Sequence, residues 1–226
     1  MTNASFGSDL GILALVWLAC WGASFLLIRR GITYISNPVI TSLLFLSCSI
    51  PLVALYRPRL EPLLRPVTAS SLAVLALAAA LTLAVYVVAP RFLRRPGELI
   101  QRHPAEFYLR LEYRYLLPKS CEVLFQQVFM AVLTTTLAAT GLRLTGVVLA
   151  FLAIFGVLHL PMLGVVGKRV GVAYGIASVT LAAAFPLLIL RVPSGIVYSY
   201  TAHWFFYTVV ALSAWVASAR APKPRT

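Results

Sequence analysis

The sequence of 226 residues has few charged residues, and acidic residues are the scarcest of these. Charged residues make up 11% of the chain, and 6 Asp and Glu stand against 19 Lys and Arg, which gives a net charge of +13. Hydrophobic residues make up 61%, whereas soluble domains contain about 45–50%. A soluble domain is therefore excluded. At about 20 apolar residues for each membrane-spanning helix, roughly six to eight spans would use almost the whole chain.

Cysteine is also scarce. Cys20, Cys48 and Cys121 all fall within or at the edge of apolar segments, so they are predicted to be buried thiols without a disulfide framework. The N-terminus lacks the basic region of a signal peptide, and the first apolar segment is therefore predicted to be retained as a span.

The basic residues occur in short segments between long apolar runs. This distribution is typical of the positive-inside rule of membrane proteins and not of a nucleic-acid-binding surface. Membrane lipids are accordingly expected as partners, and nucleic acid is not.

Long apolar runs divide the chain. Strands are excluded because open sheet edges cannot face lipid and the runs do not alternate. The sequence predicts an all-α polytopic transmembrane bundle of about seven spans, forming a single transmembrane domain over 1–226. Three N-terminal spans lie in 1–90, an interfacial segment in 91–119 and a core in 120–217. The expected spans are roughly 10–28, 37–56, 68–90, 120–139, 147–167, 170–190 and 195–217.

The Lys and Arg residues in alternate connections predict the orientation. With the N-terminus outside, fourteen basic residues fall on the cytoplasmic side and five on the outer side. The predicted topology is N-out and C-in, in the cell membrane, with a cytoplasmic C-terminus. The five outer residues are Arg57, Arg59, Arg65, Arg143 and Arg191, and the cytoplasmic ones include Lys119. The basic and aromatic residues of 91–119 suit a helix in the cytoplasmic headgroup layer, and a solvated loop is the alternative.

Three ionisable side chains lie within the predicted spans: Glu122, His159 and His203. Such residues are costly in a membrane and indicate a functional site by default. Each has a neighbour four residues away on the same helix face, and we predict that the three form one polar cluster. The pairs are Glu122 with Gln126, Phe155 with His159, and His203 with Tyr207.

Each of these residues also has a purely structural interpretation. Glu122 can be a carboxylate at a helix start, paired with Lys119. His159, which precedes Pro161, can be a neutral histidine bonded to a backbone carbonyl, and His203 can be an interhelical hydrogen-bonding residue.

The same residues resemble the motifs of the CPBP family, the membrane proteins that include CAAX prenyl endopeptidases and Abi-type proteins. CEVLFQ from Cys121 to Gln126 resembles EExxxR, Phe155 to His159 matches FxxxH, and His203 to Tyr207 resembles HxxxN. The resemblance covers about 115–215. It implies an intramembrane endopeptidase in which His159 activates water and His203 helps to hold the oxyanion, with no cofactor.

The chain departs from these motifs at three positions. Cys121 replaces the first glutamate, which is the expected base, Gln126 replaces the arginine, and Tyr207 replaces the asparagine. Adjacent helical positions differ by about 100° in direction, so Glu122 does not simply replace the missing base.

Several functions therefore stay open. The chain can be an endopeptidase that uses Glu122, His159 and His203 on a membrane-embedded peptide, or one with Cys121 as nucleophile and His159 as base. Alternatively, it is an inactive family member that serves as an accessory subunit, scaffold or assembly factor of a membrane complex. A metal site formed by Cys121, Glu122 and the two histidines has suitable ligand types but poor geometry, and no metal is expected. A small transporter has little support.

Overall fold

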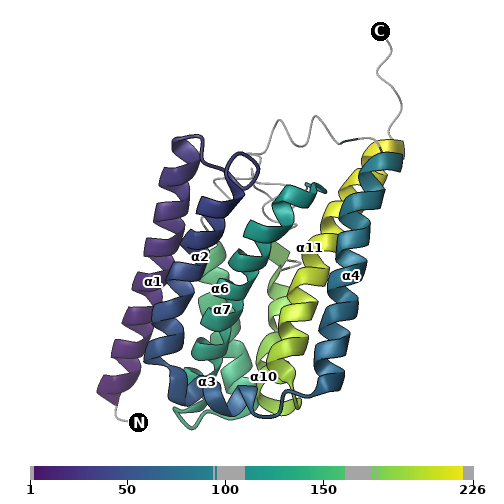
Figure 1. The fold of residues 1–226 in the computed structure, drawn as a ribbon. Coiled ribbons are helices and arrows are strands. Elements are labelled where there is room, and N and C mark those ends of the chain that lie inside the picture. The colour runs from purple at the N-terminus through teal and green to yellow at the C-terminus, as the bar shows by residue number, and fades with distance from the viewer. Residues whose placement is uncertain (1–2, 94, 96–109, 161–174, 177, 221–226) are drawn as a thin grey trace.

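The described part of the chain consists of helices and the short connections between them. The computed structural model describes residues 3–93, 95, 110–160, 175–176 and 178–220, and these residues contain helices and no strand (Figure 1). The predicted all-α fold is confirmed. The helices are α1 (Asn3–Arg29), α2 (Pro38–Leu55), α3 (Arg57–Leu64), α4 (Ala69–Phe92), α6 (Tyr113–Ala138), α7 (Leu144–His159), α10 (Ala184–Arg191) and α11 (Gly195–Arg220).

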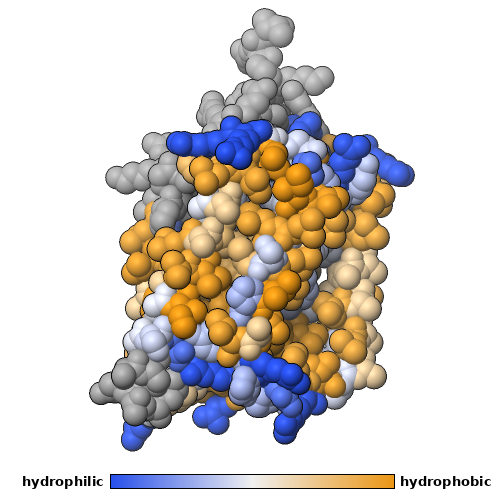
Figure 2. Space-filling model, turned by 60° about the vertical axis from the view of Figure 1, so that its left-hand side comes forward, coloured by the Kyte–Doolittle hydropathy of each residue, from blue (hydrophilic) through white to orange (hydrophobic). Residues whose placement is uncertain are grey.

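Four of these helices are long and apolar enough to cross a bilayer: α1 from Phe6, α2, α4 and α6. They correspond to the predicted runs 10–28, 37–56, 68–90 and 120–139. Leu144–His159 and Ser178–Arg191 are shorter apolar helices. Residues 161–174, which include parts of the predicted runs 147–167 and 170–190, lie outside the described residues. Figure 2 shows an apolar band on the surface with hydrophilic residues above and below it, as expected of a membrane protein.

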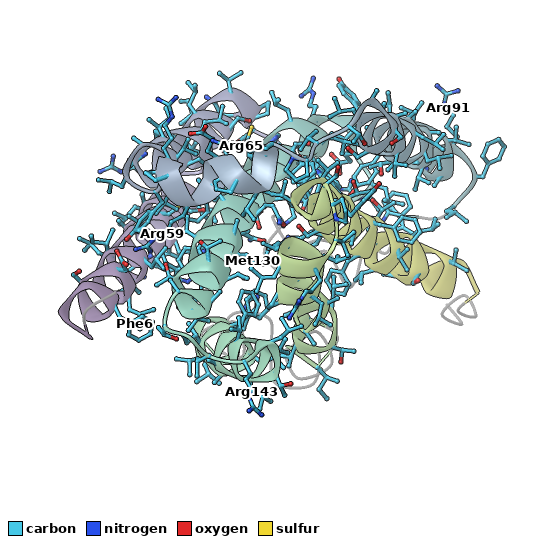
Figure 3. The ribbon with its side chains drawn as sticks, turned by 90° about the horizontal axis from the view of Figure 1, so that it is seen from below. Phe6, Arg59, Arg65, Arg91, Met130 and Arg143 are labelled. Atoms are coloured by element: carbon cyan, nitrogen blue, oxygen red, sulfur yellow. The ribbon has the colours of Figure 1, made fainter. Side chains whose placement is uncertain are left out.

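α6 is the central helix of the bundle. Within its most apolar window 83% of the residues are buried, whereas only 11% are buried in α4. Viewed from one end, Met130 of α6 lies in the middle of the bundle, and Arg143 lies at its rim (Figure 3). Because α6 contacts α2, α11, α7, α10 and α1, its polar side chains face protein instead of lipid.

Local sequence signals set the starts of two spanning helices. Asn37 precedes Pro38, and its side-chain oxygen accepts a hydrogen bond from the Ile40 N–H, so that α2 begins with an N-cap and a proline in its first turn. Thr68 and Ser71 form a reciprocal capping box at the start of α4. These signals explain why the predicted runs 37–56 and 68–90 agree closely with α2 and α4.

A salt bridge at one end of the bundle fastens the short helix α3. The Arg59 guanidinium lies 2.7 Å from the Asp9 carboxylate of α1 and donates to Thr136 of α6 at 2.7 Å. Tyr56 donates to the same carboxylate at 3.0 Å, and burial with this hydrogen bond raises the pKa of Tyr56 to about 12. Arg59 was predicted only as a loop charge; in the structure it joins three helices.

The turn before α11 determines where that helix begins. Ser194 has a φ of 59°, a left-handed conformation that is uncommon for a residue with a side chain. Its hydroxyl donates to the Pro66 carbonyl at 2.6 Å and so attaches the turn to the segment before α4. At Gly195 a Cβ atom would overlap the Leu188 carbonyl, so the close approach of α10 and α11 requires glycine.

The start of α6 differs from the prediction. The helix begins at Tyr113 and not near 120, which places Lys119 inside a helix where it is 4% exposed. Lys119 is thus a buried residue of the core and not a loop charge, because an acidic partner on the next turn pairs with it. Most of the predicted interfacial segment, 96–109, lies outside the described residues.

Candidate active site

Glu122 lies in a fully bonded group of side chains, which we name the carboxylate cluster. Its Oε1 accepts hydrogen bonds from Lys119 Nζ at 2.7 Å and Gln126 Nε2 at 2.8 Å, and its Oε2 accepts from the Tyr34 hydroxyl at 2.6 Å. Lys119, Glu122 and Gln126 stand on successive turns of α6, whereas Tyr34 comes from the connection between α1 and α2. The predicted pairings of Glu122 with Gln126 and with Lys119 are confirmed, but Glu122 lies inside α6 and not at a helix start, because the helix begins at Tyr113.

Tyr34 stays protonated in this environment. It is 3% exposed, and burial, together with the neighbouring Glu122 carboxylate, holds the pKa of its hydroxyl well above the ordinary value. A neutral hydroxyl can donate to a carboxylate, and both oxygens of Glu122 are consequently engaged. In this state Glu122 has a structural environment and not the environment of a general base.

Lys119 connects the carboxylate cluster to α11. Its ammonium lies 3.7 Å from the centre of the Tyr207 ring, over the face of that ring. A cation over an aromatic face is attracted by the electron-rich ring, most strongly where water is excluded. The ammonium is thus shared between the Glu122 carboxylate and the Tyr207 ring.

Cys121 points to another part of the interior. Its thiol lies beside the Ser42 side chain of α2, whose hydroxyl donates to the Pro38 carbonyl at 2.6 Å, and Cys121 is 7% exposed. It does not line the pocket that contains the histidines. The position of the expected first glutamate is therefore occupied by a thiol at the interface between α6 and α2.

The two histidines line one pocket, which we name the histidine pocket. His159 comes from α7 and His203 from α11, and between them α10 and the helical residues before it provide further walls. His203 stacks on Tyr207 with ring centres 5.3 Å apart, and the centre of the Phe185 ring also lies 5.3 Å from that of His203. The described lining residues are Phe155, His159, Ser178, Leu181, Phe185, His203, Phe206 and Tyr207.

His159 is oriented by its own helix. Its Nδ1 lies 2.8 Å from the Phe155 carbonyl oxygen, and its ring lies 4.0 Å from that of Phe155. A carbonyl oxygen only accepts, so Nδ1 carries the proton and Nε2 is left as a hydrogen-bond acceptor. The predicted pairing of Phe155 with His159 is confirmed, and His159 does bond a backbone carbonyl, as its structural interpretation proposed.

Two buried polar atoms in the histidine pocket have no hydrogen-bond partner among the described residues: His203 Nδ1 and Ser178 Oγ. Their side chains are 5% and 6% exposed. Seven buried polar side-chain atoms of the described residues lack a hydrogen-bond partner, and these two are distinguished from the other five because they belong to residues of the histidine pocket.

The predicted single cluster is thus divided into two regions. Glu122 and Gln126 belong to the carboxylate cluster, and His159, His203, Phe155 and Tyr207 line the histidine pocket. Across the described residues, no three His, Cys, Asp or Glu side chains are placed to share a metal ion, so the alternative of a four-ligand metal site lacks its geometry. The two regions meet where Lys119 contacts Tyr207.

Sequence reasoning missed two residues of these regions. Tyr34 lies 88 positions before Glu122, and no local pattern indicates a contact over such a separation. Ser178 is a single serine in an apolar run, a type of residue that usually bonds its own helix, and only its unpartnered hydroxyl in the structure distinguishes it.

Comparison of the chain with protein-family models, with curated protein sequences and with solved structures gave no significant match.

Proposed function

We propose that this chain is a membrane-embedded peptide-bond hydrolase, a divergent relative of the CPBP endopeptidases, with the histidine pocket as its reaction site. The observation that carries the proposal is the meeting of His159 and His203 in one pocket, with His203 Nδ1 unpartnered among the described residues. A histidine with a free acceptor can take a proton, and a buried N–H can stabilise an oxyanion.

The expected substrate is a peptide or protein segment within the membrane. The pocket walls are mainly aromatic and aliphatic, and the described lining residues include no Asp, Glu, Lys or Arg. Such walls accept uncharged, apolar groups.

Identification of new N-termini by mass spectrometry tests this activity. Membranes that contain the wild-type protein are compared with membranes that contain His159→Gln, His203→Gln or the control Thr180→Val, whose residue lies exposed on the same helical segment as Ser178. We expect protein fragments with the wild type and the control, and at least about 100-fold less with either histidine variant. Fragments that persist in both histidine variants would show that the pocket does not carry out the cleavage.

The second candidate function is a non-catalytic subunit or assembly factor of a membrane complex. The bonding of both Glu122 oxygens and the contact of Cys121 with Ser42 favour it, because neither residue is free for the role expected at its motif position. Under this function, no fragments depend on the protein, and gentle-detergent purification yields a fixed stoichiometry of other membrane subunits.

We also propose the topology with seven spans, N-out and C-in, in the cell membrane. In Figure 1 the described N-terminal end and α3 lie at one end of the bundle, and the C-terminal end of α11 lies at the other. The excess of basic residues in the connections at the C-terminal end supports a cytoplasmic placement of that end. Reporter domains fused to each terminus test this, and a shared side for both termini would contradict it.

A further inference from the structure

Ser178 is placed to perform chemistry that no motif assigns to it. It belongs to an apolar helical segment, it is buried, it is one of the residues that line the histidine pocket, and its hydroxyl has no partner among the described residues. By contrast, the hydroxyl of the nearby Thr180 donates to the Ile176 carbonyl at 2.8 Å, as serine and threonine commonly do in helices. Ser178 therefore has an unsatisfied hydroxyl in a pocket with two histidines.

The residues expected to supply a nucleophile or activate one are engaged elsewhere. Both Glu122 oxygens accept hydrogen bonds, and the Cys121 thiol contacts Ser42. Neither residue lines the histidine pocket. Four of the described lining residues can carry a proton or attack a carbonyl: His159, His203, Ser178 and Tyr207. Of these, only Ser178 has an aliphatic hydroxyl.

His159 has the features of a base for such a hydroxyl. The Phe155 carbonyl fixes the proton on Nδ1 and makes Nε2 the acceptor nitrogen, while the Phe155 ring restrains the imidazole. An oriented imidazole with one free acceptor is the arrangement that activates serine in hydrolases on unrelated folds. His203 Nδ1 is then available to donate to the developing oxyanion.

We propose that Ser178 is the nucleophile of the histidine pocket, with His159 as its general base, and that it acts on acyl groups of uncharged, membrane-embedded substrates. This inference rests on the proposed hydrolase function. The Ser178 hydroxyl proton passes to His159 Nε2 while Oγ forms a bond to the carbonyl carbon, whose π electrons move to the oxygen. The bond to the leaving group then breaks, and the leaving group takes the proton from His159. Water hydrolyses the acyl-serine by the same steps and restores the hydroxyl.

Ser178 Oγ has no hydrogen bond to His159 or to any other described residue. Hydrogen bonds between a nucleophile and its base are frequently long before substrate binds and shorten in the complex. The apolar walls formed by Leu181, Phe185 and Phe206 would position a hydrophobic acyl or peptide group beside the hydroxyl.

Labelling with an alkyl fluorophosphonate tests the proposal on the full-length protein in lipid nanodiscs. The Ser178 oxygen would form a bond to phosphorus, fluoride would leave, and His159 would take the hydroxyl proton. We expect one adduct by intact-mass measurement, located on Ser178 by peptide mapping. Ser178→Ala should lose it, His159→Gln should form it at least about 100-fold more slowly, and the control Thr180→Val should label as the wild type does.

The outcomes separate this inference from the proposed function. Ser178→Ala removes a single oxygen, and an unchanged unfolding temperature shows that its effect is not due to misfolding. If Ser178→Ala keeps the histidine-dependent cleavage, or if the adduct forms on another residue, Ser178 is not the nucleophile although the hydrolase function stands. If the wild type neither cleaves nor labels, both proposals fail. Loss of cleavage and of labelling in Ser178→Ala, with both kept in Thr180→Val, supports them together.

Discussion

The carboxylate cluster and the histidine pocket lie next to each other in the bundle but differ in hydrogen bonding. In the first, every oxygen of Glu122 has a donor at 2.8 Å or less. In the second, two buried polar atoms have no partner among the described residues. A satisfied buried ion pair stabilises one arrangement of helices, whereas unsatisfied buried groups cost stability and are retained at sites that act on something else. Glu122 thus has the environment of a structural residue, and the histidines differ from it in the way that the proposed function requires.

The largest expected effect on stability comes from breaking the carboxylate cluster. Lys119→Met leaves the Glu122 carboxylate buried without its cation, which should lower the free energy of unfolding by about 3–5 kcal/mol. Thermal unfolding in detergent measures this loss. The double variant Lys119→Met/Glu122→Gln removes both charges and should recover much of it. A single variant as stable as the wild type would contradict the structural role of the pair.

A smaller loss is expected when one donor of the cluster is removed. Tyr34→Phe deletes the hydroxyl that donates to Glu122 Oε2 while it keeps the ring against Tyr115. Hydrogen bonds to charged groups contribute about 1.5–3 kcal/mol, so the unfolding temperature should fall by less than in Lys119→Met. Equal unfolding temperatures for Tyr34→Phe and the wild type would show that Glu122 does not need this donor.

The Asp9–Arg59 salt bridge at the end of the bundle allows the effect of burial on the strength of an ion pair to be measured. Its side chains are 13% and 27% exposed, against about 4–5% for the Lys119–Glu122 pair. Partial hydration weakens an ion pair and also reduces the cost of losing a partner, so Asp9→Asn should cost about 1 kcal/mol. A loss as large as that of Lys119→Met in the same unfolding measurement would show that burial does not separate the two pairs.

A small effect on stability is expected in the histidine pocket, where the effect on activity is the largest. His203→Gln removes an imidazole whose Nδ1 makes no hydrogen bond with the described residues, so the main loss is its stacking on Tyr207, and the free energy of unfolding should fall by about 0.5–1.5 kcal/mol. Cleavage should nevertheless fall by about 100-fold or more. Unfolding and cleavage measured on one preparation check both effects. A strongly destabilised but active variant would reverse the roles assigned to the two regions.

Much of the fold could be predicted because its signals are local. Asn37, Pro38 and Thr68 mark helix starts within a few residues, and apolar runs of sufficient length mark α1, α2, α4 and α6. The site was predicted only in part. The pairs at a spacing of four residues lie on single helices, so Gln126 was correctly joined to Glu122 and Phe155 to His159. Contacts between segments far apart in the sequence, such as Tyr34 with Glu122, have no such local signal.

The sequence by itself determined that this chain is a helical membrane protein and that its few intramembrane ionisable residues sit at helical spacings, because hydrophobicity and periodicity are local properties. Only the tertiary structure decided that Glu122 is saturated by Lys119, Gln126 and Tyr34, and that His159, His203 and Ser178 share a pocket. The physical reason is that the rotation and tilt of each helix follow from packing against its neighbours. Rotation and tilt determine which helix faces meet, and therefore which polar groups find hydrogen-bond partners and which do not.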